Sequence, residues 1–136
     1  MNKAHSFFQG TLVLLALVSA LGAQAEPTSP MAQLRRWEQA AGQAGQAERG
    51  RQWFAQRHGG EWSCASCHQA VPTQAGRHAS TGKRIEPLAP AAHPERLTDQ
   101  AKADKWFRRN CKDVLSRECS AQEKADVLAY LIALKP

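Results

Sequence analysis

The hydrophobic positions that follow residue 30 repeat with the spacing of α-helices. In residues 31–41, Leu34 and Trp37 fall on one side, and residues 47–58 carry Phe54 on a similar packing face. Glycines separate the two stretches and also follow the second one. The pattern predicts two short helices, each with one apolar face.

A third amphipathic stretch closes the chain. Ser120 and Glu123 form a capping box, which is typical of the first turn of a helix. Four apolar residues then repeat at helical spacing before Leu134: Val127, Leu128, Leu131 and Ile132. Because a glycine inside a helix usually marks the close approach of another element, we expect this helix to cross the second one near Gly50.

The segment between these helices is less regular. Residues 71–99 contain four prolines and no periodic pattern, which predicts a long loop. Thr98 is a good N-cap for a helix over residues 98–110, with Trp106 and Phe107 expected to be buried.

The first two cysteines, Cys64 and Cys67, lie three residues apart, and His68 follows directly. Positions i and i+3 share one face of a helix, so both thiols can add to the vinyl groups of one haem while the histidine binds its iron. The motif predicts one covalent haem c, with Cys64 and Cys67 as the thioether links and His68 as the proximal ligand. A zinc half-site or a thiol redox pair are the alternatives, although zinc usually needs a second pair of ligands.

The N-terminus has the features of a secretory signal. Lys3 precedes the apolar residues 11–21, and Ala23 and Ala25 form a small-x-small cleavage site. The apolar run is too short to span a bilayer, so we expect residues 1–25 to be removed and no membrane span to remain. Residues 26–136 would then form a single monohaem domain in the periplasm.

Composition adds two expectations. The formal net charge of +6 suits docking to an acidic partner or a solvated surface, and no nucleic-acid module is evident. The two cysteines outside the haem motif, Cys111 and Cys119, are expected to form a disulfide in an oxidising compartment, with two buried thiols as the alternative. Residues 111–119 would then be a tight loop, and the domain would be all-α, since no segment alternates like a strand.

The second axial ligand is the open question. A methionine is usual in electron-carrying cytochromes, but only Met1, in the signal, and Met31, before the haem motif, are present. Either histidine of the long loop, His78 or His93, would give a closed bis-histidine site. A lysine could bind only as the neutral amine. The candidates are therefore His78, His93, Lys83 and Lys105.

Several segments of the sequence resemble a known family of cytochromes. The haem motif and four other segments are similar to the sphaeroides haem proteins, which are oxygen-binding, high-spin class I cytochromes c. These segments are Ala47–Arg51, Thr81–Pro90, Lys105–Cys111 and Arg117–Asp126. The resemblance implies a class I cytochrome c fold, Asn110 as the distal iron ligand, and a disulfide between Cys111 and Cys119.

The same resemblance implies a function. We expect a cytochrome whose amide ligand leaves the iron on reduction, so that O2, NO or CO can bind, with a dihaem cytochrome c and a membrane cytochrome b as redox partners. A conventional bis-histidine electron carrier and a haem enzyme that turns over NO or peroxide are the alternatives. Arg108 and Arg109 flank the distal region, where they could meet an anion or a haem propionate, or simply be solvated.

Overall fold

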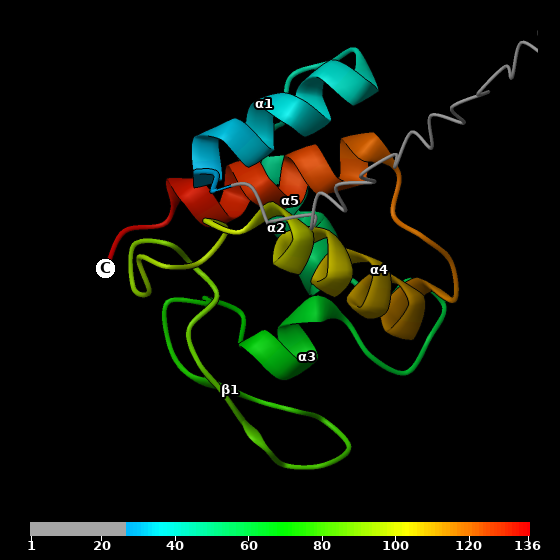
Figure 1. Cartoon of the computed structure of the whole chain (residues 1–136). Coiled ribbons are helices and arrows are strands. Elements are labelled where there is room, and N and C mark those ends of the chain that lie inside the picture. The colour runs from blue at the N-terminus through cyan, green and yellow to red at the C-terminus, as the bar shows by residue number, and fades with distance from the viewer. Residues whose placement is uncertain (1–26) are drawn as a thin grey trace, which may run out of the picture.

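The computed structural model describes residues 27–136, and the predicted signal peptide lies outside this range. The described residues form five helices and one two-stranded hairpin (Figure 1). In chain order these are α1 (Pro30–Ala41), α2 (Ala47–Ala55), α3 (Cys64–His68), β1 (Gly76–Arg77), β2 (Arg84–Ile85), α4 (Gln100–Leu115) and α5 (Ala121–Ala133). The expected all-α fold is confirmed, since each strand has only two residues.

Helix α5 is the centre of the core and packs against both α1 and α2 (Figure 1). On the α2 side, Phe54 packs with Val127, Tyr130 and Leu131. On the α1 side, a second buried cluster joins Leu34, Ala125 and Leu128. The apolar repeat of the C-terminal segment is thus used on two faces, because two helices cover it.

The crossing of α2 and α5 occurs at Gly50, as expected. A Cβ atom on this residue would lie 1.9 Å from the backbone oxygen of Asp126. Any side chain here would push the helices apart, which explains why a glycine interrupts the apolar face of α2.

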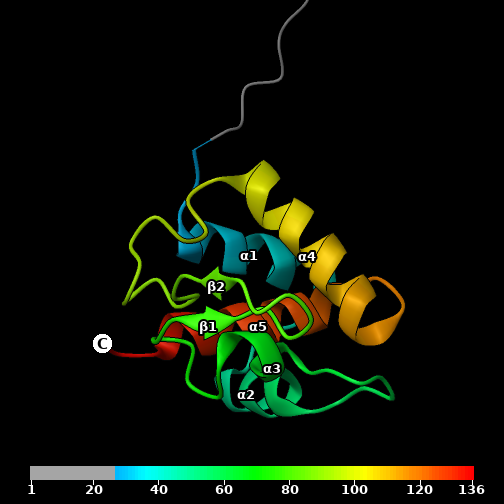
Figure 2. The ribbon, with the colours of Figure 1, turned by 90° about the horizontal axis from the view of Figure 1, so that it is seen from below.

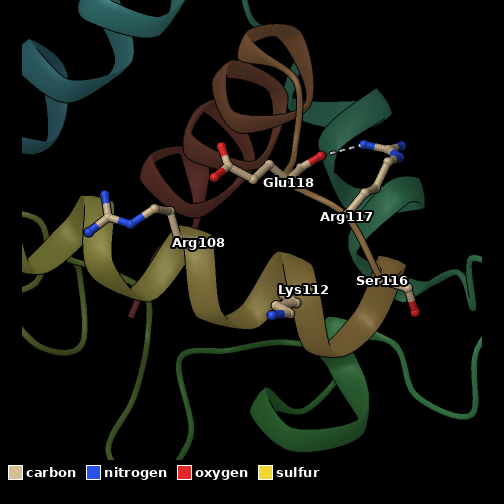
Figure 3. A pocket seen from close by; sticks show the side chains of 5 residues that line it. All are labelled: Arg108, Lys112, Ser116, Arg117 and Glu118. Atoms are coloured by element: carbon tan, nitrogen blue, oxygen red, sulfur yellow. Dashed lines mark hydrogen bonds between the residues drawn. The ribbon is translucent and has the colours of Figure 1, made fainter.

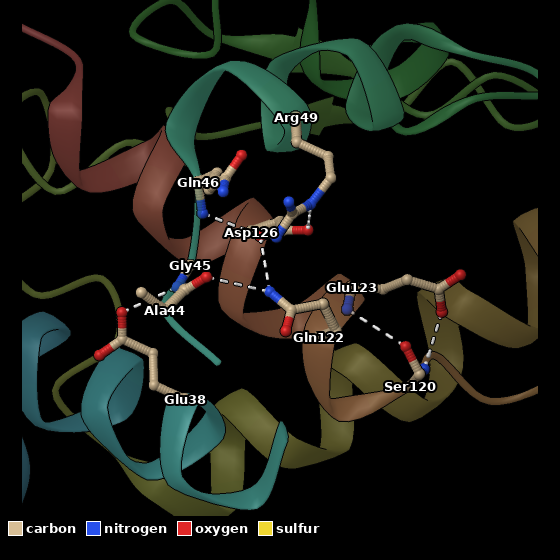
Figure 4. Close-up of polar contacts among 9 residues, drawn as sticks. All are labelled: Glu38, Ala44, Gly45, Gln46, Arg49, Ser120, Gln122, Glu123 and Asp126. Atoms are coloured by element: carbon tan, nitrogen blue, oxygen red, sulfur yellow. Dashed lines mark hydrogen bonds and ion pairs between the residues drawn. The ribbon is translucent and has the colours of Figure 1, made fainter. Parts of the chain in front are cut away.

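A buried carboxylate links α2 and α5 at the same place (Figure 4). Asp126 accepts hydrogen bonds from the backbone N–H of Gln46 at 2.8 Å and from Gln122 at 3.0 Å, and pairs with Arg49. Burial alone would raise the pKa of Asp126, but these hydrogen bonds, led by that from Arg49, hold it below its ordinary value. Gln46 is the N-cap residue of α2, but its side chain makes no capping hydrogen bond. By accepting from the Gln46 backbone N–H, Asp126 therefore helps to define where α2 begins.

Four local predictions were wrong, and one of them is the N-cap of α4, which is Asp99 rather than Thr98. The second helix ends at Ala55 rather than near residue 58. Helix α4 continues to Leu115, so only residues 116–119 are irregular where a loop over residues 111–119 was expected. The helix continues because Cys111 and Val114 extend its buried face, and it ends at Ser116, which has a left-handed backbone. Trp106, predicted to be buried, is 42% exposed.

The long segment before α4 is ordered by contacts at its two ends. The β1–β2 hairpin pairs Gly76 with Ile85, and the carbonyl of Pro72 accepts hydrogen bonds from the backbone N–H groups of Leu88 and Ala89, each at 3.0 Å. Asp99 then caps α4 by accepting a bond from Lys102 N–H at 2.8 Å. The segment has no periodic sequence signal because backbone contacts, rather than an apolar face, determine its path.

Candidate haem site

The haem motif forms the short helix α3, which begins with a reciprocal cap. The Ser63 hydroxyl accepts from the backbone N–H of Ser66 at 3.2 Å, and the Ser66 hydroxyl accepts from Ser63 N–H at 2.9 Å. One of the two variable residues inside the motif therefore stabilises its helical turn. The turn is what brings Cys64 and Cys67 onto one side.

Three contacts hold α3 against the rest of the molecule. The Phe54 ring of α2 lies 6.3 Å from the His68 ring, and the Tyr130 hydroxyl of α5 donates to Ala70 O at 2.8 Å. At Gly76, a Cβ atom would lie 2.0 Å from the carbonyl oxygen of Cys67. The proximal side is therefore enclosed by α2, α5 and β1 together.

A cavity of about 920 Å³, called the haem cavity below, opens between α3 and α4. The two helices lie apart in both views of the ribbon (Figures 1 and 2), and both contribute to the lining. Cys64, Cys67 and His68 line it, and so does Asn110. Its apolar lining includes Phe54, Leu88, Leu97, Phe107, Val127 and Leu131.

Burial determines the protonation of the motif residues. It lowers the pKa of His68 to about 4, and the positive charge of Arg96 adds to this effect. Burial also raises the pKa of the Cys64 thiol to about 12. His68 is thus neutral at pH 7, which is the form that binds a metal. The sulfur of Cys67 accepts a hydrogen bond from Ala79 N–H at 3.3 Å.

These properties fit a covalent haem. The cavity has the size of a cofactor pocket and a largely apolar lining, as expected for a flat macrocycle. Two free cysteines and one neutral imidazole lie on a single helical turn at its edge. Cys64 and Cys67 would hold the haem, and His68 would bind its iron.

Asn110 lies on α4 and is half-buried. No hydrogen bond engages its side chain within residues 27–136. The next residue, Cys111, forms a disulfide with Cys119, with a Cα–Cα distance of 5.5 Å. The expected disulfide is therefore present. It links the last part of α4 to Cys119, which directly precedes Ser120, the N-cap of α5.

Some of the other candidate iron ligands line the haem cavity and others do not. His78 and His93 both line the haem cavity, and Lys83 does as well. The Nδ1 atom of His78 is engaged with Thr81 N–H at 3.4 Å, within the β1–β2 turn. Lys105 and Met31 are exposed and do not contribute to the lining.

Three residues near the cavity were not singled out from the sequence. Tyr130 was assigned to the core alone, Gly76 had no distinguishing context, and Arg96 was one of many arginines. Each of them acts on a backbone group distant in the sequence or across a loop, so no local pattern could reveal it.

A second, smaller hollow of about 410 Å³ lies on the outer side of α4. Arg108, Lys112 and Arg117 line it with Ser116 and Glu118, and their side chains point in different directions (Figure 3). Arg108 and Arg109 are both exposed, but Arg108 borders this outer hollow and Arg109 borders the haem cavity. Among the residues described, no helix is long and apolar enough to cross a membrane.

The fold and the site together define the class. An all-helical domain whose Cys-x-x-Cys-His turn opens into an apolar, haem-sized cavity is a monohaem class I cytochrome c. A family model described as "Domain of unknown function (DUF1924)" matches residues 25–131. The chain belongs to the family of the sphaeroides haem protein, SHP, and its cofactor is a single haem c.

The similarity extends over nearly the whole chain. The cytochrome c-type protein SHP of Cereibacter sphaeroides is 46% identical over 125 residues, which cover 89% of this chain and 96% of the relative. The structure of oxidised SHP, described as an oxygen-binding cytochrome c, superimposes with a TM-score of 0.74 at 47% identity, covering 80% of this chain and 100% of that one.

Cytochrome c'' of Methylophilus methylotrophus is a second relative. It is 43% identical over 79 residues, which cover 58% of this chain and 55% of that protein. Its oxidised crystal structure gives a TM-score of 0.71 at 32% identity, with coverages of 79% and 95%. A solution structure of the same protein, described as giving insights into haem-ligand detachment, gives 0.70 at 32% identity, with coverages of 79% and 94%.

Proposed function

We propose that this cytochrome takes part in electron transfer and binds O2, NO or CO at its reduced iron, with His68 as the proximal ligand and Asn110 as a labile distal ligand. The observation that carries the proposal is that the haem cavity is lined by His68 from one helix and by Asn110 from another. Oxygen binding by SHP and haem-ligand detachment in cytochrome c'' support it.

The haem iron, when bound, supplies one-electron chemistry and an affinity for diatomic gases in the reduced state. The amide oxygen of Asn110 is a neutral, hard donor, which favours ferric over ferrous iron. Reduction is therefore expected to release the side chain. The freed amide N–H can then donate a hydrogen bond to a diatomic molecule in the cavity, a role that a methionine cannot fill.

The proposed location is the periplasm, with residues 1–25 as the cleaved signal and residues 26–136 as one domain. The disulfide between Cys111 and Cys119 supports this, because such bonds persist in oxidising compartments. The mass of the protein secreted with its signal tests the proposal. A mass equal to residues 26–136 plus one haem is expected, and a retained N-terminus would contradict cleavage.

An electron-transfer role requires redox partners, and a dihaem cytochrome c and a membrane cytochrome b remain the proposed ones. The exposed side of α4 is the candidate surface for them. It carries five exposed basic residues, of which Arg108 and Lys112 are seen in Figure 3: Lys102, Lys105, Arg108, Arg109 and Lys112. Such a surface attracts acidic partners and speeds their association at low salt.

The alternative with the most support is a closed bis-histidine carrier, because His93 lines the haem cavity and is half-buried. Turnover of NO or peroxide at the iron stays a further alternative. Optical spectra of the ferric and ferrous protein, with and without CO, separate the first two. A ferrous spectrum that shifts with CO supports the open site, and a low-spin ferrous spectrum that ignores CO would exclude it.

Asn110→Ala tests the ligand itself. We expect covalent haem attachment to be unchanged and the ferric spectrum to change, because one axial ligand is lost. The matched control is His93→Ala, which removes one of the two half-buried histidines of the same cavity, the other being His78. If His93→Ala alters the ferric spectrum and Asn110→Ala does not, the distal ligand is the histidine.

A further inference from the structure

Arg96 closes the loop that follows β2. Its Nε atom donates to the carbonyl of Pro87 at 2.8 Å, and one terminal nitrogen donates to the carbonyl of Glu86 at 3.0 Å. One guanidinium therefore binds two successive backbone oxygens and joins the two ends of residues 86–96. The side chain is half-buried and lines the haem cavity.

The same loop is attached to the chain just after the haem motif. Leu88 and Ala89 donate their backbone N–H groups to Pro72 O, four residues beyond His68, and Ala89 is fully buried. The loop thus forms a wall of the cavity that is anchored at Pro72 and closed by Arg96. Leu88 and Leu97, near its two ends, supply apolar contacts to the cavity.

No carboxylate of residues 27–136 forms an ion pair with Arg96. Its side-chain hydrogen bonds go to uncharged carbonyls, and none of the salt bridges within residues 27–136 includes it. Arg84, another cation of the same lining, differs in this respect because it pairs with Glu86 at 3.0 Å. Arg96 and His68 line the same cavity, so the charge of Arg96 lies in the space that the haem would fill.

We propose that Arg96 is a positioning residue with two effects, holding the loop of residues 86–96 against the proximal side of the cavity and favouring the reduced iron through its fixed positive charge. Reduction adds one electron to the iron and so removes one positive charge there, which lowers the repulsion from a nearby guanidinium. The inference rests on His68 as the proximal ligand and is independent of Asn110.

The charge effect is tested by redox titration of the haem-loaded protein. At a fixed applied potential, Arg96→Gln is expected to lower the ratio of ferrous to ferric protein by about tenfold, which corresponds to about 59 mV for one electron. Arg96→Lys keeps the charge and is expected to stay within about twofold of the unmodified protein. The matched control Arg84→Gln is expected to behave like Arg96→Lys, because Glu86 already offsets its charge.

The positioning effect is tested by hydrogen exchange of the backbone N–H groups of Leu88 and Ala89, followed by mass spectrometry. Both Arg96 variants should exchange about tenfold faster, because lysine cannot bind two carbonyls in the same plane. Arg84→Gln should not change the rate. If Arg96→Gln assembles poorly, Arg96→Lys still tests the loop.

Three results would overturn the inference. Arg96→Gln could shift the redox ratio no more than Arg84→Gln does. Arg96→Lys could shift it as much as Arg96→Gln, in which case charge is not the cause. Exchange at Leu88 and Ala89 could be unchanged in both variants. CO binding by the same proteins reports on the distal site, so a failure here is separate from a failure of the gas-binding proposal.

Discussion

The two helices that face the haem cavity are held in different ways. Helix α3 is enclosed by backbone and aromatic contacts: its cap is reciprocal, α2 packs against it, and β1 approaches so closely at Gly76 that no side chain fits. Helix α4 is tied by side chains, through the Arg36–Asp104 pair at 2.5 Å and the disulfide at Cys111.

The difference matches the proposed roles of the two sides. A proximal ligand that stays on the iron requires a fixed helix, and close backbone packing allows little adjustment. A distal ligand that leaves the iron needs a helix whose position is limited but not clamped. Contacts at the two halves of α4, with Asn110 just before the disulfide, have this character.

The largest expected effect is on the proximal side. Gly76→Ala places a Cβ atom 2.0 Å from the Cys67 carbonyl oxygen, a backbone atom that cannot turn away. We expect the free energy of unfolding to fall by about 3 kcal/mol, measured by urea denaturation of the haem-loaded protein. The control Gly82→Ala meets no atom within 4 Å, and its positive φ should cost only about 1 kcal/mol. Equal losses would show that β1 does not constrain α3.

The next effect concerns the tie at the end of α4. Replacing both Cys111 and Cys119 by serine should lower the free energy of unfolding by about 2.5 kcal/mol, on the chain-entropy argument for a short loop. Hydrogen exchange should rise in the last turn of α4 and not in α3. Equal acceleration in both helices would remove the distinction between the two sides.

The smallest expected effect is a loss of stability at low pH, caused by an ion pair beside the disulfide. Arg117, in the disulfide loop, pairs with Glu123 of α5 at 2.7 Å, and this hydrogen bond lowers the pKa of Glu123 to about 2. Because the folded-state pKa is depressed, the stabilisation is present above the unfolded pKa near 4.5 and is lost as pH falls toward 2.

The pair is partly exposed, so about 1 kcal/mol is expected from it. Urea denaturation at pH 6 and at pH 2.5 should show a smaller acid loss in Glu123→Gln than in the unmodified protein. The control is Glu48→Gln, since Glu48 pairs with Arg51 of the same helix, α2, and both side chains are largely exposed. An identical acid loss in the Glu123 variant and the unmodified protein would contradict the prediction.

Most of the fold followed from local patterns. The capping box at Ser120, the apolar repeat of α5 and Gly50 predicted the central helix and its crossing, because helix signals lie within a few residues of each other. The errors lay where a tertiary contact overrides a local one. Helix α4 continues past Cys111 because that face is buried, and Trp106 is 42% exposed because it lines the haem cavity rather than the core.

The site divides in the same way. The sequence alone determined the cofactor, since two cysteines and a histidine on one turn need only the geometry of a helix to meet one haem. It also determined the lack of a methionine in the usual place. The tertiary structure decided which side chains share the cavity with His68: Asn110 from α4, His93 and Arg96 from an aperiodic loop. These come together only through contacts between distant segments, and no residue spacing encodes them.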